Sequence, residues 1–306
     1  MGAVLLVPGV TGVGPLAAPM VGGTYWRGWK SALKNQGFNT VLKVSQPPGA
    51  GLEACVTAAL PTLLNNASPT NRAHLIGHSR GGLIVRRMAT LHPTLVRSVT
   101  CVATPHRGQL LMDLYEDLAV YCHAMNFVLP GNGNMSPNDP LLVLTHAMSQ
   151  GLLASTVVDA LVQFNQDNHD QKHIAYANVI GVLDHRPPSL ALVGSAALLE
   201  LAEPGTTGLP ADVQKVVDHW RATQLMAYKA APDDILYGNL NQQRGHDGAV
   251  VAECARTISP GHIELLTHLD HSEQVGLALL ADSGGLARRV ALNVLKPAEQ
   301  SLTFPP

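Results

Sequence analysis

Charged residues are scarce in this 306-residue sequence, and neither sign dominates. Asp, Glu, Lys and Arg make up 14% of it against 46% apolar residues, and the formal net charge is −2. This balance indicates a chain that buries a sizeable core and argues against disorder. The sequence also lacks basic runs and zinc-ligand spacings, which disfavours nucleic acid and other polyanions as partners.

Long hydrophobic runs are missing as well. The most apolar stretch in the second half, residues 190–202, is shorter than a bilayer span and contains Glu200. The apolar run at the start is too short for a signal peptide and has no basic flank. We therefore expect no transmembrane segment. We expect secretion if a signal peptide has been removed, and a cytoplasmic location if Met1 is the native start.

Cysteines are few, and no two of them form a close metal-ligand pair. The four are Cys55, Cys101, Cys122 and Cys254. Cys101 lies in a predicted buried strand, where an unpaired thiol acts as a small apolar side chain. One disulfide is compatible with this number, but the count does not identify the compartment.

The first third of the chain alternates short β-branched apolar runs with helical stretches. Strands are predicted at 3–7, 40–44, 73–77 and 98–103, with helices near 26–35, 51–64 and 81–91. Apolar runs separated by helices indicate βαβ units and a parallel sheet covered on both faces. The sequence thus predicts an α/β fold with a mostly parallel central sheet flanked by helices.

This alternation stops in the middle of the chain. Residues 109 to about 168 contain no convincing strand, and in their second half apolar residues recur at helical spacing. We interpret this stretch as a helical cap or lid inserted into one domain that spans residues 1–306. A further strand is predicted at 174–182.

The segment Gly77-His78-Ser79-Arg80-Gly81 matches the pattern G-x-S-x-G, between a predicted strand and a predicted helix. A sharp strand-to-helix turn strains the serine backbone, so small residues are needed two before and two after it. The turn projects the hydroxyl above the carboxyl end of the sheet, where a helix N-terminus favours negative charge. This context indicates an α/β-hydrolase fold with Ser79 as its nucleophile. The alternative is a tight turn that holds a serine by chance.

Two backbone N–H groups are candidates for an oxyanion hole, which stabilises the negative charge of a tetrahedral intermediate. One belongs to Arg80, directly after the nucleophile. The other should come from the loop after the first strand, where we choose the N–H of Val10. An ordinary glycine turn is the alternative for this loop.

A serine nucleophile needs a histidine base and an acid, in the chain order serine, acid, histidine. Asp247 lies in a turn-like Gly-His-Asp-Gly segment, and His268 precedes a C-terminal helix. From the residues alone, Asp184 is an alternative acid. His262 and His271 are alternative bases.

Taken together, these motifs resemble the bacterial true lipases of the Pseudomonas, Burkholderia and Proteus type. The matching segments are the first strand and its loop, the first helix, the elbow, the strand and turn after it, and two downstream motifs: residues 4–12, 25–37, 77–82, 98–108, 246–248 and 268–274. By position, the resemblance implies Ser79 as nucleophile, Asp247 as acid and His268 as base. The insertion and residues 185–240 match poorly.

The same resemblance implies a structural calcium ion near the catalytic histidine and no cofactor for the chemistry. Calcium prefers carboxylate and carbonyl oxygens. The implied ligands are Asp270, Gln274, the carbonyl of Ala278 and a second carboxylate from Asp234 or Asp233. A plain helix cap at Asp270 is the alternative.

The residues and the resemblance predict a serine carboxylic ester hydrolase. We expect a lipase that cleaves acylglycerol esters through an acyl-enzyme, with a lipid or ester substrate met at a lipid–water interface. An apolar lid would favour medium or long acyl chains. A carboxylesterase, a polyester hydrolase and an acyltransferase are alternatives on the same scaffold. A non-catalytic binding protein would usually have lost a member of the triad.

Overall fold

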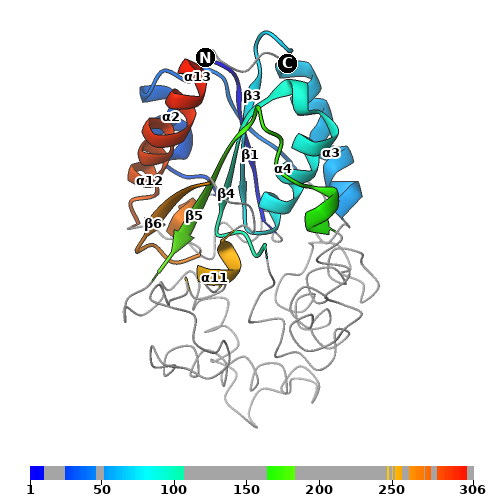
Figure 1. The fold of residues 1–306 in the computed structure, drawn as a ribbon. Coiled ribbons are helices and arrows are strands. Elements are labelled where there is room, and N and C mark those ends of the chain that lie inside the picture. The colour runs from blue at the N-terminus through cyan, green and yellow to red at the C-terminus, as the bar shows by residue number, and fades with distance from the viewer. Residues whose placement is uncertain are drawn as a thin grey trace, which may run out of the picture.

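A central sheet with helices on both sides forms the part of the chain that the computed structural model describes (Figure 1). The described residues are 1–9, 25–45, 52–106, 164–182, 247, 250, 252–256, 262–271, 273–276 and 281–301. The architecture is an α/β fold with a parallel central sheet flanked by helices, as predicted.

All pairings in the six-stranded sheet are parallel, in the order β2-β1-β3-β4-β5-β6. The strands are β1 (Val4–Val7), β2 (Val41–Lys43), β3 (Ala73–His78), β4 (Val96–Val102), β5 (Ala175–Gly181) and β6 (Ile263–Thr267). The first five are the predicted strands, with ends shifted by two residues or fewer. Strand β6 was missed because it is short, lies at the sheet edge and exposes Glu264 and Leu266, so it has no continuous apolar run.

The described helices form two layers, one on each face of the sheet (Figure 1). On one face lie α3 (Leu52–Asn66) and α4 (Arg80–Leu91); on the other lie α2 (Trp29–Asn35), α12 (Ser283–Val290), η4 (Ala291–Leu295) and α13 (Lys296–Gln300). Shorter elements are η1 (Pro93–Leu95), α11 (Ala252–Ala255) and η3 (Glu273–Val275).

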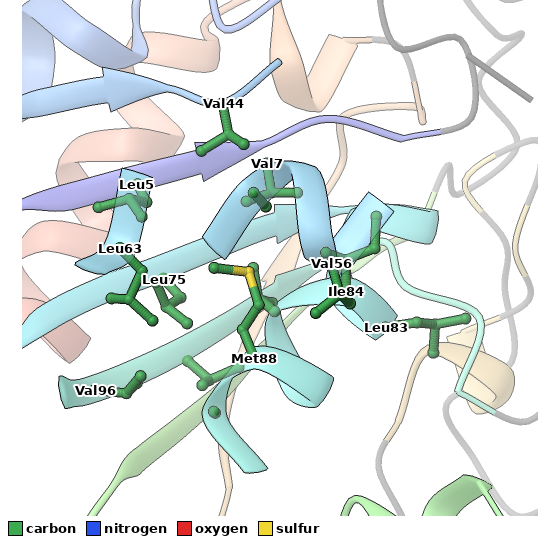
Figure 2. Close-up of a cluster of buried hydrophobic side chains, with 14 of the residues drawn as sticks. Leu5, Val7, Val44, Val56, Leu63, Leu75, Leu83, Ile84, Met88 and Val96 are labelled. Atoms are coloured by element: carbon green, nitrogen blue, oxygen red, sulfur yellow. The ribbon is translucent and has the colours of Figure 1, made fainter. Parts of the chain in front are cut away.

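Alternate residues of β1 supply the two cores, because successive side chains of a strand point to opposite faces. Leu5 and Val7 pack with residues of α3 and α4 in the cluster drawn in Figure 2. Val4 and Leu6 pack in the second cluster, with residues of α2 and α12. All four side chains are fully buried, which is the expected pattern for a parallel strand covered on both faces.

The predicted cap lies outside the described residues, except for residues 164–168 at its end. This end is attached to α4. Arg86 donates to the side-chain oxygen of Asn165 (2.8 Å) and to the carbonyl of Asn168 (3.0 Å), and its guanidinium lies over the ring of Phe164.

Cys55 and Cys101 are both buried, and Cys101 forms no disulfide, which confirms the prediction that Cys101 is unpaired. Cys122 lies outside the described residues. No helix in the described ranges has the length and apolarity needed to cross a bilayer.

Candidate active site

The backbone at Ser79 makes the sharp strand-to-helix turn that the motif predicts. Ser79 follows the last residue of β3 and precedes the first residue of α4, with φ 54° and ψ −127°. A positive φ is unfavourable for any residue except glycine, so the surrounding structure must impose it. The N–H of Ser79 donates to the carbonyl of Val102 at the end of β4 (2.8 Å), which attaches the turn to the sheet.

The two glycines of the motif are required by close backbone contacts. A Cβ at Gly77 would lie 2.2 Å from the carbonyl oxygen of Gly81, and a Cβ at Gly81 would lie 2.3 Å from the carbonyl oxygen of Val7. Both distances are far below van der Waals contact, so a larger residue at either site would displace the turn. The G-x-S-x-G spacing therefore follows from the packing of this turn.

Asp247 is bonded to His271 rather than to the predicted base. Oδ2 of Asp247 accepts a hydrogen bond from Nδ1 of His271 (2.9 Å), and the main-chain N–H of His271 donates to the carbonyl of Asp247 (2.9 Å). Because Nδ1 carries the proton in this bond, Nε2 is the nitrogen that can act as a base.

Asp247 itself is held by several donors. Its side chain is buried, with 1% of the residue exposed. Oδ1 accepts from the N–H of Val250 (2.7 Å), and Oδ2 also accepts from Nε2 of Gln274 (3.1 Å). These bonds fix the direction in which the carboxylate faces His271.

His268 directly follows β6 and is exposed. The chain turns after β6, and the carboxylate of Asp270 caps η3: its Oδ1 accepts from the N–H of Glu273 (2.7 Å), while Glu273 Oε2 accepts from the N–H of Asp270 (2.8 Å). This turn brings His271, and not His268, into contact with Asp247. The Asp-x-x-Glu pattern at 270–273 predicts a helix start from the sequence, but it does not select His271 as the partner of Asp247.

Of the other alternative residues for the base and the acid, the structure describes His262 but not Asp184. His262 precedes β6 and bonds Oδ2 of Asp170 (2.5 Å), so it lies at the opposite end of that strand from His271. Asp184 lies outside the described residues, so the structure does not compare it with Asp247 as the acid.

His78, the residue before Ser79, connects the elbow to the segment of His271. The two rings lie with centroids 4.5 Å apart, and Nε2 of His78 donates to the carbonyl of His271 (2.9 Å). Burial, together with the neighbouring His271, holds the pKa of His78 well below its ordinary value. His78 is therefore neutral, and the imidazole of His271 lies next to the turn that presents Ser79.

One of the two predicted oxyanion donors is described. Arg80 is the first residue of α4, so its N–H lies in the N-terminal turn, where main-chain N–H groups have no acceptor within the helix itself. Its buried guanidinium reaches Sγ of Cys55 (Nη2 to Sγ 3.4 Å). Val10 lies outside the described residues, but Gly9 before it packs against Ser79. A Cβ at Gly9 would lie 3.0 Å from the Cβ of Ser79. The loop after β1 thus begins beside Ser79.

Of the predicted calcium ligands, the structure describes Asp270 and Gln274. Asp270 is engaged as the cap of η3, and the amide of Gln274 donates to Asp247 and to the carbonyl of Leu269. Ala278, Asp234 and Asp233 lie outside the described residues. Within the described ranges, no group of three or more His, Cys, Asp or Glu residues could hold a metal ion.

Comparisons with known proteins concern the fold and part of the sequence. A family model described as the alpha/beta hydrolase fold matches residues 45–120. A triacylglycerol lipase of Pseudarthrobacter phenanthrenivorans is 36% identical over 124 residues, which cover 38% of this chain and 36% of that protein. A triacylglycerol lipase of Burkholderia plantarii is 36% identical over 124 residues, which cover 38% of this chain and 32% of that protein. The match therefore spans about a third of the length of these curated relatives.

Among solved structures, the crystal structure of a metagenomic carboxyl esterase is similar over nearly the whole chain. The similarity covers 98% of this chain and 76% of the esterase, with a TM-score of 0.60 and 14% sequence identity. At this identity the likeness concerns the fold. The chain is thus similar to hydrolases in fold and, over part of its length, to lipases in sequence.

Proposed function

We propose that this chain, which has the α/β-hydrolase fold and is related over part of its length to bacterial triacylglycerol lipases, is a serine carboxylic ester hydrolase. The observation that carries the proposal is the hydrogen bond between Asp247 and His271, in a segment bonded to the residue before Ser79. A buried carboxylate, an oriented imidazole and a serine on a strained turn suit acyl transfer. We assign the base to His271, in place of His268.

In the proposed reaction, Oγ of Ser79 attacks the ester carbonyl while its proton passes to Nε2 of His271. The tetrahedral intermediate then expels the alkoxide, which takes that proton and leaves as an alcohol. Water, deprotonated by His271, attacks the acyl-enzyme in the same way. Collapse of the second tetrahedral intermediate releases the carboxylic acid and restores the hydroxyl of Ser79. Asp247 stabilises the protonated imidazole in both halves.

For the oxyanion we propose the N–H groups of Arg80 and Val10. The proposal is supported by the place of Arg80 at the start of α4 and by the contact of Gly9 with Ser79. Loss of one donor of this kind typically reduces kcat by about 10²–10³-fold.

For the substrate we propose acylglycerol esters, because the matched relatives are triacylglycerol lipases. The chemistry uses no cofactor, since nucleophile, base and acid are side chains of the chain itself. For Asp270 we propose the role of helix cap, because its carboxylate is already bonded to the N–H of Glu273.

Labelling with a fluorescent serine-reactive phosphonate tests the nucleophile. Wild-type protein should be labelled, and Ser79→Ala should lose labelling and reduce ester hydrolysis by about 10⁴-fold or more. Ser98→Ala is the matched control, because Ser98 is also buried and its hydroxyl bonds to His74 (2.7 Å) on β3. Labelling that persists in Ser79→Ala would refute the assignment.

A chain-length series of esters tests the substrate class. Hydrolysis of emulsified triolein, absent in Ser79→Ala, would support a lipase. Cleavage of short soluble esters without any cleavage of triolein would leave a carboxylesterase. Transfer to an added alcohol that outruns hydrolysis would indicate an acyltransferase.

A further inference from the structure

A chain of hydrogen bonds runs from the loop after β1 to the main chain of the proposed base. The N–H of Gly9 donates to the hydroxyl oxygen of Tyr25 (2.7 Å), and this hydroxyl lies 2.6 Å from Nδ1 of His78. Nε2 of His78 donates to the carbonyl of His271 (2.9 Å). Tyr25 and His78 therefore connect Gly9, in the loop after β1, with the main chain of His271.

The direction of each bond in this chain is determined by its partners. The carbonyl of His271 can only accept, so the proton of neutral His78 is on Nε2 and Nδ1 is an acceptor. Tyr25 must then donate its O–H to Nδ1, which leaves its oxygen to accept from Gly9. Burial raises the pKa of Tyr25 above its ordinary value, so the hydroxyl keeps the proton that this bond needs.

Aromatic packing restrains the same two side chains. The ring of Tyr25 meets those of Trp26 and His78 edge to face, each with centroids 5.6 Å apart. Trp29 nearby donates from Nε1 to the carbonyl of Gln274 (2.8 Å), in the η3 segment that follows His271. Tyr25 is thus connected to the segment of His271 through His78, and Trp29 at the start of α2 bonds the same segment separately.

We propose that Tyr25 and His78 are positioning residues. Through their hydrogen bonds they hold Gly9, at the start of the loop after β1, and His271 in fixed positions relative to Ser79. This inference rests on the proposed function. Gly9 precedes the proposed donor Val10, and His78 precedes the nucleophile itself. A displacement of about 1 Å in such a site costs on the order of 10²-fold in rate. Removal of the connection should therefore lower kcat although neither residue is assigned a step in the reaction.

The first test compares buried Tyr25 with half-buried Tyr176, because the hydroxyl of each accepts a hydrogen bond from a main-chain N–H. Tyr25→Phe deletes the hydroxyl between Gly9 and His78. Tyr176→Phe is the matched control. Tyr176 lies at the start of β5, and its hydroxyl accepts from the N–H of Gln171 (3.1 Å). With a short p-nitrophenyl ester, we expect kcat of Tyr25→Phe to fall about 10- to 100-fold with KM within about 3-fold. The control should keep kcat within about 2-fold.

The second test uses His78, whose replacement by glutamine keeps an N–H donor for the carbonyl of His271. His78→Leu keeps bulk but has no donor. We expect His78→Gln to retain at least about a third of wild-type kcat and His78→Leu to lose at least about 10-fold. Circular dichroism melts show whether each variant is folded at the assay temperature.

Equal kcat in Tyr25→Phe and the control, or equal loss in both His78 variants, would overturn the positioning role. Failure of the proposed function gives a different result: wild-type protein would show no hydrolysis that Ser79→Ala abolishes. Wild-type activity that depends on Ser79, together with an unaffected Tyr25→Phe, would refute the inference alone.

Discussion

In the described part of the chain, three histidines lie against carboxylates, at two different ends of the sheet. His271 follows β6 and bonds Asp247, whereas His262 precedes β6 and bonds Asp170. The third pair, His74 with Glu299, lies at the start of β3. Since all strands are parallel, the first pair is at the carboxyl end of the sheet and the other two lie toward its amino end.

The ring nitrogens of these histidines differ in a way that matters for catalysis. His74 is bonded at both nitrogens, to Ser98 (2.7 Å) and Glu299 (3.2 Å). His262 is likewise bonded at both, to Asn178 and Asp170. His271 bonds Asp247 through Nδ1, and within the described residues its Nε2 has no hydrogen-bond partner. A histidine–carboxylate pair indicates a base only where the second nitrogen remains available beside a nucleophile.

The largest effect on activity should come from substitution of His271, the proposed base. We expect His271→Gln to lower kcat by about 10⁴-fold or more, because the proton of Ser79 then has no acceptor. His262→Gln, which alters a pair of the same chemistry at the other end of β6, should keep kcat within about 3-fold. Initial rates on a short p-nitrophenyl ester measure both.

His268→Gln tests whether the base is His271, as we propose from the structure, or His268, as the resemblance implies. His268 is exposed, so this variant should also remain within about 3-fold of wild type. A collapse of activity in His268→Gln with an active His271→Gln would reverse our assignment of the base.

A smaller effect is expected at the His74–Glu299 pair, and it should be an effect on the stability of the fold. Burial by itself would raise the pKa of Glu299, but hydrogen bonds from His74 and from the N–H of Gly2, with the charge of Arg97, lower it to about 2. The ordinary pKa is 4.5, so this carboxylate stabilises the folded state above pH 4.5 and loses that contribution as the pH falls toward 2.

Glu299→Gln should therefore destabilise the protein by about 1 kcal/mol near neutral pH, a figure reduced for solvent screening of this half-buried group. Its difference from wild type in urea melts should shrink between pH 4.5 and the acid limit of the folded state. A difference that grows on acidification would contradict this account. The kcat of the variant at neutral pH serves as the control and should be unchanged.

The smallest effect should be that of a chelator. The carboxylate of Asp270 caps η3, so EDTA should shift Tm by less than about 1 °C, whereas Asp270→Ala should cost about 0.5–2 kcal/mol as a lost cap. A shift of several degrees with EDTA, reversed by added calcium, would show that the implied calcium site exists.

Much of the fold was predictable because its signals are local. The apolar runs of β1, β3 and β4 and the helices between them follow from periodicity over a few residues. The turn at Ser79 was predictable for the same reason, since the required glycines lie two residues before and after it. Strand β6 was not predictable, because its exposed residues interrupt the apolar pattern and only its pairing with β5 makes it a strand.

The sequence by itself determined a parallel α/β sheet and the turn that presents Ser79, because both depend on contacts between near neighbours. Only the tertiary structure decided which of three histidines in ten residues bonds to Asp247. That choice depends on where β6 ends and how the Asp270 cap turns the chain, and it is made by contacts between segments far apart in the sequence: His271 with Asp247, and His271 with His78 almost two hundred residues earlier.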